Sequence, residues 1–418
     1  MTSFSIQSFG CRVNQAEAFA WADEFQKHGL RYERDHKNSD VVLVNTCTVT
    51  HRADSDFRAF LRRIQRTNPG ARLVLTGCLT ERVKEDWSRY PQVWKVVSNR
   101  EKENLCQKLF PGLELQPESP KKLFRSRALI KIQEGCDLAC RFCIVPSVRG
   151  QSASCSKPKV LDRVREYLDQ GYEEIVLTGV HLCLYGRDLR PRSSLLELLR
   201  DLEGVPRLKR IRLSSLDPRF MTEALLDHLA SSARICPHFH LSLQSGADRV
   251  LSSMGRRISV AEYRRILSFL RERLPLASLG ADILAGFPGE TGDDFKKTHA
   301  FLEDSPLTYF HVFVFSPRPG TPAADRPQVS ESVKAERSSL LRELSRKKNW
   351  RFRELLRGKE FDAVVIRKKI RNALALTSNY IRVEIPVIPW AERKAFALTI
   401  TRVTRDKTFG ENTYAVPY

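Results

Sequence analysis

The sequence lacks any apolar run that approaches the roughly 20 residues a membrane span requires. Its first residues, MTSFSIQSFGC, lack the basic segment and apolar stretch of a secretory leader. It also lacks the fixed-period repeats of solenoid proteins. These absences exclude the membrane-spanning and repeat classes, and we expect a cytoplasmic protein with no membrane partner. A chain of 418 residues, 42% hydrophobic and 28% charged, is long enough for two or three packed domains.

Acidic residues are scarce relative to basic ones, and the net charge is +21. A surplus of this size indicates a polyanionic partner, although composition alone does not separate nucleic acid from a membrane surface. Much of it lies near the C-terminal end, where residues 331–418 contain 20 Lys and Arg against 10 Asp and Glu. An ordinary solvated face would give the same pattern, so the charge leaves both interpretations open.

Strand-like and helical patterns alternate over residues 1–110. Short runs rich in Val, Ile and Leu (SFSIQSFGC, DVVLVNTC and ARLVLTGC) are separated by amphipathic segments such as Glu17–His28 and Asp54–Arg66. Runs of this length and composition favour parallel strands buried on both faces. We therefore predict a doubly wound parallel α/β domain. A segment rich in Pro, Lys and Ser over 111–126 is predicted to be a linker.

The alternation resumes over residues 127–316 with six candidate strands. Six β/α units are too few for a closed eight-stranded barrel and predict a partial (β/α)6 barrel with its chemistry at the carboxyl ends of the strands. Residues 331–357 are predicted to form a long basic amphipathic helix. The tail from Gly358 is predicted to form a small all-β barrel, a fold that commonly binds RNA. The candidate strands are Ala128–Gln133, Glu174–Val180, Arg210–Ser214, His238–Leu243, Gly280–Ala285 and Tyr309–Phe315.

Three of the ten cysteines are tightly spaced. Cys136, Cys140 and Cys143 in EGCDLACRFC follow the strand ALIKIQ, at the mouth of the predicted barrel. Because cytosolic thiols stay reduced, we expect these residues to be metal ligands and not disulfides. Three thiolates would hold three irons of a 4Fe–4S cluster and leave the fourth iron with an open position. Zinc with a distant fourth ligand is the alternative.

Another three cysteines, Cys11, Cys47 and Cys78, are far apart in sequence, but each directly follows a predicted strand in SFGC, VNTC and LTGC. The carboxyl ends of neighbouring parallel strands share one crevice, so three separate β/α units could bring their thiols to one point. Unrelated structural cysteines would have no reason to share this position. The spacing of the other four indicates no ligation, and we assign no role to Cys106, Cys155, Cys183 and Cys236.

The motif C-x3-C-x2-C after the first strand of a partial barrel resembles the radical S-adenosylmethionine superfamily. This resemblance implies that S-adenosylmethionine chelates the open iron, and that one-electron reduction cleaves it to a 5′-deoxyadenosyl radical. It also implies a cofactor pocket at the strand ends, although GFPGET could equally be a turn before the capping box Thr291-x-x-Asp294. The implied pocket residues are Thr178, Gly179, His181, Ser214, Ser215, Asp217, Gln244, Ser245 and Gly286.

The segments SFGCRVNQAE, NTCTVTHRAD and LTGC resemble the amino-terminal domain of methylthiotransferases, a branch of that superfamily. In this branch Cys11, Cys47 and Cys78 would hold a second, auxiliary 4Fe–4S cluster, where sulfur is methylated before transfer. GCDLACRFCIVPSVRG, EIVLTGVHL, LSLQSGADRVL, GFPGET and VFSPRPGTPAA match in order, and TSNYIRVEIP resembles the RNA-binding TRAM domain. The implied domains are 1–112 for the auxiliary cluster, 122–356 for the radical core with the basic helix, and 357–418 for the TRAM-like barrel.

GCRVNQ and NTCTVT-x-x-AD resemble the branch that acts on N6-threonylcarbamoyladenosine beside the tRNA anticodon. The expected reaction inserts a methylthio group at C2 of that base. The expected partners are the tRNA anticodon stem-loop, a low-potential electron donor of flavodoxin or ferredoxin type, and a sulfur donor. The basic tail favours RNA, because phosphate contacts dominate RNA affinity.

Four alternatives remain. Sibling methylthiotransferases act on isopentenyladenosine in tRNA or on an aspartate of a ribosomal protein. A cobalamin-dependent radical enzyme would share the layout, but its D-x-H-x-x-G signature is absent from the sequence. A non-enzymatic RNA-binding iron–sulfur redox sensor would need neither an open iron nor a second set of three cysteines. Release of 5′-deoxyadenosine on adding reductant and cofactor would separate the sensor from the enzymes.

Overall fold

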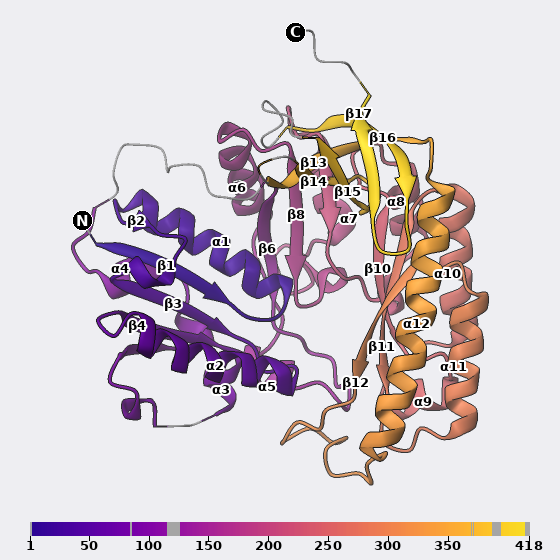
Figure 1. Ribbon diagram of the computed structural model, residues 1–418, viewed down its shortest axis with the longest axis horizontal. Helices are drawn as coiled ribbons and strands as arrows, with labels where there is room; N and C mark the ends of the chain where they lie inside the picture. The colour runs from indigo at the N-terminus through magenta and orange to yellow at the C-terminus, as the bar shows by residue number, and fades with distance from the viewer. Residues whose placement is uncertain are drawn as a thin grey trace.

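The computed structural model describes residues 2–83, 86–114, 126–368, 370, 372–386 and 394–413. Along the chain, a parallel sheet is followed by a partial β/α barrel and then by a small closed β-barrel (Figure 1). The predicted fold class is therefore confirmed. Most of the predicted linker over 111–126 lies outside the described residues. Among the described helices, none combines the length and the apolar character that crossing a bilayer requires.

The first sheet has five parallel strands in the order β2-β1-β3-β4-β5. Alternate residues of β3 face opposite layers: Leu43 packs with the core beneath α1, and Val42 packs with Phe57 of α2. The bounds are β1 Ser3–Ser8, α1 Arg12–Lys27, β2 Arg31–Tyr32, β3 Val41–Thr46, α2 His51–Thr67, β4 Arg72–Gly77, α3 Cys78–Arg82, β5 Val93–Val97 and α4 Leu105–Leu109.

The partial barrel consists of two sheets, β7-β6-β8-β9 and β10-β11-β12, which single parallel bridges join at Ile211–Ile235 and Leu216–Leu241. All six predicted strands are present, with ends that differ by at most two residues. The strands are β6 Ala128–Glu134, β7 Ala153–Ser154, β8 Glu174–Gly179, β9 Arg210–Leu213, β10 His238–Gln244, β11 Ser278–Ala285 and β12 Tyr309–Val314. The helices are α5 Val145–Arg149, α6 Lys157–Asp169, α7 Leu195–Glu203, α8 Glu223–Ser231, α9 Asp248–Ser253, α10 Val260–Arg273 and α11 Gly292–Asp304.

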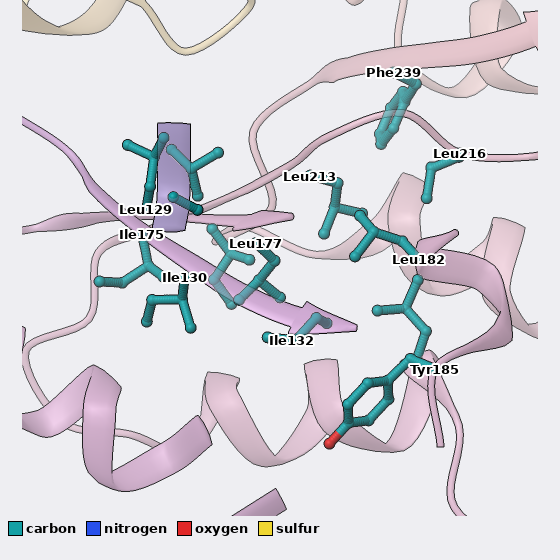
Figure 2. Close-up of a cluster of buried hydrophobic side chains, with 14 of the residues drawn as sticks. Leu129, Ile130, Ile132, Ile175, Leu177, Leu182, Tyr185, Leu213, Leu216 and Phe239 are labelled. Atoms are coloured by element: carbon teal, nitrogen blue, oxygen red, sulfur yellow. The ribbon is translucent and has the colours of Figure 1, made fainter. Parts of the chain in front are cut away.

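Aliphatic side chains from β6, β8 and β9 form the core of the barrel (Figure 2). Ile132, Leu177 and Leu213 are at most 2% exposed and pack against Leu182 and Tyr185, which follow β8. Burying each such side chain stabilises the fold by about 1.5–3 kcal/mol. The polar residues that follow the carboxyl ends of these strands are therefore held by a tightly packed core. Short 3-10 turns lie at His36–Asn38, Trp87–Arg89, Asn99–Glu101, Leu182–Leu184 and Pro218–Phe220.

The predicted basic helix is present as α12, Glu331–Leu355. It packs along β12, where the Ser345 hydroxyl donates to the Phe310 carbonyl oxygen at 2.8 Å (Figure 1). The chain then forms a closed barrel with the strand order β13-β14-β15-β17-β16, as predicted for the tail. Its strands are β13 Glu360–Lys368, β14 Asn372–Thr377, β15 Arg382–Pro386, β16 Phe396–Val403 and β17 Thr408–Asn412.

The turn between β14 and β15 docks on the partial barrel. Arg212 donates hydrogen bonds to the carbonyl oxygens of Thr377 (3.1 Å) and Ser378 (3.0 Å). The ring of Tyr380 stacks on His238 with ring centroids 4.0 Å apart. The closed barrel is therefore attached near the strands that carry the predicted chemistry.

Candidate functional site

Cys11, Cys47 and Cys78 line one cavity of about 570 Å³. Each follows the carboxyl end of its strand, and these strands, β1, β3 and β4, are neighbours in the sheet. Cys11 precedes α1 and Cys78 begins α3, so both thiols lie at helix starts. The structure thus brings together three residues that are widely separated in the sequence.

Two glycines shape the backbone beside these thiols. Gly10 has φ +86°, and a Cβ atom built there would lie 2.4 Å from the Sγ of Cys47. Gly77 has φ +109°, and a Cβ there would lie 2.3 Å from the Thr46 carbonyl oxygen. Only glycine adopts these conformations at low cost and leaves this space free. Three thiols around a cavity kept clear in this way fit an iron–sulfur cluster.

Burial raises the pKa of the Cys47 thiol to about 12 and also raises the pKa of Cys78. The Arg149 guanidinium opposes this effect at Cys78, because its Nε lies 3.2 Å from the Sγ of Cys78 and favours the thiolate. A metal ligand must be deprotonated. Arg149 therefore supplies part of the charge compensation that a buried thiolate needs.

Arg149 is itself held by buried partners. Its Nη1 lies 3.2 Å from Glu17 and 2.5 Å from Glu134, and its Nη2 donates to Asn14 Oδ1 at 2.5 Å. Burial alone would raise the pKa of Glu17, but Lys102, Arg149 and Lys131 hold it well below its usual value. Glu17 is therefore a carboxylate, and it fixes the position of the arginine.

Cys136, Cys140 and Cys143 line a second cavity, of about 1130 Å³. Gly135 precedes them with φ +66°, and a Cβ there would lie 1.8 Å from the Gln151 carbonyl oxygen. Burial raises the pKa of Cys143 to about 12. Arg149 lines this cavity as well as the first one, so one guanidinium lies between the two cysteine sets.

The nine predicted pocket residues fall into three groups. Thr178, Gly179, Ser214 and Ser215 line the cavity of Cys11, at the ends of β8 and β9. His181 and Asp217 form a buried pair, described next. Gln244 occupies a β-bulge with φ +85°, the Ser245 hydroxyl lies 3.2 Å from Thr298 Oγ1, and the Gly286 amide donates to Glu290 at 2.9 Å.

The second group, His181 and Asp217, is linked through Arg219 to Cys140 of the other cysteine set. His181 Nε2 lies 3.2 Å from Asp217, and Asp217 also accepts hydrogen bonds from Arg219 (2.6 Å) and Arg256 (3.2 Å). Burial would raise the pKa of Asp217, but hydrogen bonds from His181 and Arg219 and the charge of Arg256 hold it well below its usual range. Arg219 also lies 3.8 Å from the Sγ of Cys140. This network fixes polar groups beside the second cavity.

Sequence reasoning missed one wall of the first cavity. His238, His240, Asp282 and His311 from β10, β11 and β12 line it, together with Tyr309, Tyr380 and Arg382. Asp282 lies 2.9 Å from His240 Nε2 and 3.4 Å from His311 Nδ1. Two histidines two residues apart in the apolar strand HFHLSLQ were the available signal, because such residues share a face.

The four cysteines without an assigned role lie away from both cavities. Cys106, Cys183 and Cys236 are buried, and Cys155 packs against the same core as Cys106 and Cys183. None of them lines either cavity within the described chain. These positions agree with the sequence, in which the spacing of the four cysteines does not indicate metal ligation.

Family comparisons extend over most of the chain. Residues 130–302 match the model of the Radical SAM superfamily, and residues 3–98 match the model described as Uncharacterized protein family UPF0004. The fold resembles radical S-adenosylmethionine methyltransferase TsrM from Kitasatospora setae with a TM-score of 0.56 and 16% identity, over 78% of this chain and 74% of that one. The fold and its cysteine motif define a radical S-adenosylmethionine protein.

Curated relatives give the narrower assignment. Threonylcarbamoyladenosine tRNA methylthiotransferase MtaB of Aquifex aeolicus is 35% identical over 91% of this chain and 96% of its own length. The MtaB protein of Thermotoga maritima is 35% identical over 86% of each chain. The tRNA-2-methylthio-N(6)-dimethylallyladenosine synthase of Pelotomaculum thermopropionicum is 32% identical over 83% of each. The chain belongs to the radical S-adenosylmethionine methylthiotransferase family.

Proposed function

We propose that this protein is a tRNA methylthiotransferase that inserts a methylthio group at C2 of N6-threonylcarbamoyladenosine next to the anticodon. The observation that carries the proposal is the pair of three-cysteine sets, each facing its own cavity with Arg149 between them. Five relatives that carry the threonylcarbamoyladenosine name, at 34–36% identity, support the substrate.

Each cysteine set would hold one 4Fe–4S cluster: Cys136, Cys140 and Cys143 the radical cluster with S-adenosylmethionine, and Cys11, Cys47 and Cys78 the auxiliary one. When bound, these groups supply a radical that removes hydrogen from C2 and the methylthio group that replaces it. The nine predicted pocket residues remain our candidates for binding S-adenosylmethionine. His181 and Asp217 support this role, because their network reaches Cys140 of the radical set. Thr178 and Ser214 have buried hydroxyls without a hydrogen-bond partner among the described residues, and both line the cavity of Cys11.

The chain's own residues have positioning and electrostatic roles. Arg149 stabilises the Cys78 thiolate, and the His181–Asp217–Arg219 network fixes donors beside Cys140. Aliphatic side chains at the cavity of Cys11, such as Val13 and Leu213, exclude water from the flat face of a base. C2 of adenine has no acidic proton, so a general base would contribute little there.

The anticodon stem-loop is the proposed RNA partner, and α12 with the closed barrel is its proposed docking surface. Exposed cations such as Arg346 and Lys347 on α12 support this placement, because phosphate contacts dominate RNA affinity. We further propose domains 1–112, 122–356 and 357–418, a cytoplasmic location, a flavodoxin- or ferredoxin-type electron donor, and a separate sulfur donor.

The test is mass spectrometry of nucleosides from tRNA of a strain that lacks the gene, with and without complementation. We expect the methylthio form of threonylcarbamoyladenosine to disappear and to return with the gene. A complementing copy with Cys136, Cys140 and Cys143 changed to Ala should fail to restore it. If methylthio-isopentenyladenosine changes instead, the substrate assignment is wrong. If no tRNA nucleoside changes, the protein does not act on tRNA.

A further inference from the structure

The cavity of Cys11, Cys47 and Cys78 has two chemically different sides. Its apolar lining residues come from the first sheet and its helices, from α5 and from the ends of β8 and β9: Val13, Val49, Val145, Val180 and Leu213. The wall formed by β10, β11, β12 and the closed barrel carries only polar, charged or hydroxylated aromatic side chains. An apolar substituent would gain little from that wall, whereas a charged or hydroxylated one would find hydrogen-bond partners there.

The cations of this cavity differ in whether they already have an acidic partner. Arg149 is paired with Glu17 and Glu134. Arg382, the first residue of β15, is exposed, and its side chain has no ion pair, hydrogen bond or ring contact among the described residues. Arg12 has no acidic partner within the described chain either, and its guanidinium instead donates to the Tyr380 hydroxyl. Two arginines of the cavity are therefore available to an anion.

Asp282 also lines this cavity, but it does not neutralise Arg12 and Arg382. Asp282 is the carboxylate among the cavity's lining residues, and His240 and His311 already contact it. Burial would raise the pKa of Asp282, but the two histidines hold it well below its usual range. Asp282 is thus paired with His240 and His311. Arg12 and Arg382 have no acidic partner among the described residues.

The position of Arg382 also fits the route of an RNA nucleotide. A second groove, of about 470 Å³, adjoins the cavity and shares Tyr309, His311, Tyr380 and Arg382 with it. This second groove is lined by Arg346 of α12 and Arg405 of the closed barrel, and its acidic lining residue is Asp406. Basic grooves of this kind track a phosphate backbone. Arg382 lies at the junction, where a base that left the backbone would enter the cavity.

We propose that Arg382 and Arg12 form a carboxylate-binding subsite that reads the threonyl carboxylate of the substrate base. The proposal rests on the proposed function and deepens it. In adenine, C2 and C6 are separated by ring nitrogen N1, so the substituent on the exocyclic N6 at C6 and the hydrogen on C2 point in different directions. With C2 toward the cysteines, the N6 substituent extends to another part of the cavity wall. Arginine binds carboxylates with paired, charge-assisted hydrogen bonds, and an isopentenyl group offers no such acceptor.

The experiment compares the affinity of the anaerobically reconstituted protein for three anticodon stem-loops. The first contains threonylcarbamoyladenosine, the second an isosteric carboxamide in place of its carboxylate, and the third unmodified adenosine. Dissociation constants are measured by fluorescence anisotropy at one salt concentration, because phosphate contacts make affinity salt-dependent. We expect the carboxylate form to bind about 10-fold more tightly than the carboxamide, as for a hydrogen bond to a charged group.

Variants test whether Arg382 causes the preference for the carboxylate form. Arg382→Ala should reduce the preference to about twofold or less, and Arg382→Lys, which keeps the charge, should retain an intermediate preference. Arg367→Ala removes an exposed arginine of β13 on the same barrel and should leave the preference unchanged. If Arg382→Ala weakens all three RNAs equally, Arg382 is a general phosphate contact and the subsite is wrong. A wild-type protein without any carboxylate preference overturns it as well.

Failure of the subsite can be distinguished from failure of the proposed function. The same protein is incubated with S-adenosylmethionine, reductant, inorganic sulfide as the sulfur source and the threonylcarbamoyladenosine stem-loop, and the nucleosides are analysed by mass spectrometry. Methylthio product without a carboxylate preference refutes the subsite alone. A carboxylate preference that Arg382→Ala abolishes, without any methylthio product, refutes the proposed function and leaves the subsite in place.

Discussion

At the scale of single residues, Arg149 connects the two cysteine sites. It contacts the Cys78 thiol in one cavity and the Glu134 carboxylate at the edge of the other. A buried guanidinium is tolerated because Glu17, Glu134 and Asn14 satisfy its donors. The charge of this residue therefore acts on both sites together.

Replacing Arg149 with Met should lower the free energy of unfolding by about 3 kcal/mol, because Glu17 and Glu134 lose a buried partner. Arg149→Lys should be intermediate, since it keeps the charge without the planar fork. Urea unfolding of the reconstituted protein measures the difference. Arg165→Met, at an exposed ion pair on α6, is the control and should cost less than about 0.5 kcal/mol. Equal effects of the two Met variants would contradict the role given to Arg149.

At the scale of elements, Glu174 at the start of β8 links the partial barrel to the closed one. It lies 2.7 Å from Arg212 Nε, and Arg212 donates to the carbonyl oxygens of Thr377 and Ser378. Arg210 lies 2.5 Å from the same carboxylate. Burial alone would raise the pKa of Glu174, but Arg212, Arg210 and Arg127 lower it to about 2. The docking of the closed barrel thus depends on an ionised carboxylate.

Glu174→Gln should therefore destabilise the protein at neutral pH by about 3–5 kcal/mol, because Arg212 stays buried without its counter-charge. The pKa of the carboxyl is lower in the folded than in the unfolded chain. Its stabilisation is consequently full above about pH 4.5 and is lost as the pH falls toward about 2. Urea unfolding at several pH values should show the gap between wild type and variant narrowing over this range. Glu360→Gln, at an exposed residue of β13, should show no gap at any pH.

The sequence was sufficient to predict the elements and to group six cysteines into two sets of three, and it was insufficient to predict the residues that surround them. Strand ends carry a local signal, so Cys11, Cys47 and Cys78 could be placed at one sheet edge before the fold was known. Arg149 carries no such signal, because an arginine at the end of a short helix resembles a surface residue. Asp282 and His311 face each other only through the register of β11 with β12, and that register is a tertiary property.

At the scale of the whole molecule, two cavities with one cysteine set each imply two clusters per chain. The sets come from separate parts of the chain: one from the first sheet, the other from the loop after β6. Neither set contributes a residue to the lining of the other's cavity, within the described chain. The two sites should therefore bind iron independently.

Anaerobic reconstitution should give about eight irons per chain, four for each cluster. Changing Cys136, Cys140 and Cys143 to Ala should leave about four, and changing Cys11, Cys47 and Cys78 should also leave about four. Cys155→Ala, at a half-buried cysteine outside both cavities, is the control and should keep about eight. Iron and protein determination on the same samples measures these ratios. About four irons in the unchanged protein would contradict the two-cluster assignment.

The junction of Tyr380 with Arg12 has a consequence for biosynthesis. The three strands that deliver Cys11, Cys47 and Cys78 are complete within the first quarter of the chain, and domains generally fold from the N-terminal end as they leave the ribosome. The wall that Tyr380 and Arg382 contribute is translated after these strands. The nascent protein therefore carries these three thiols before the residues that complete their cavity have been made.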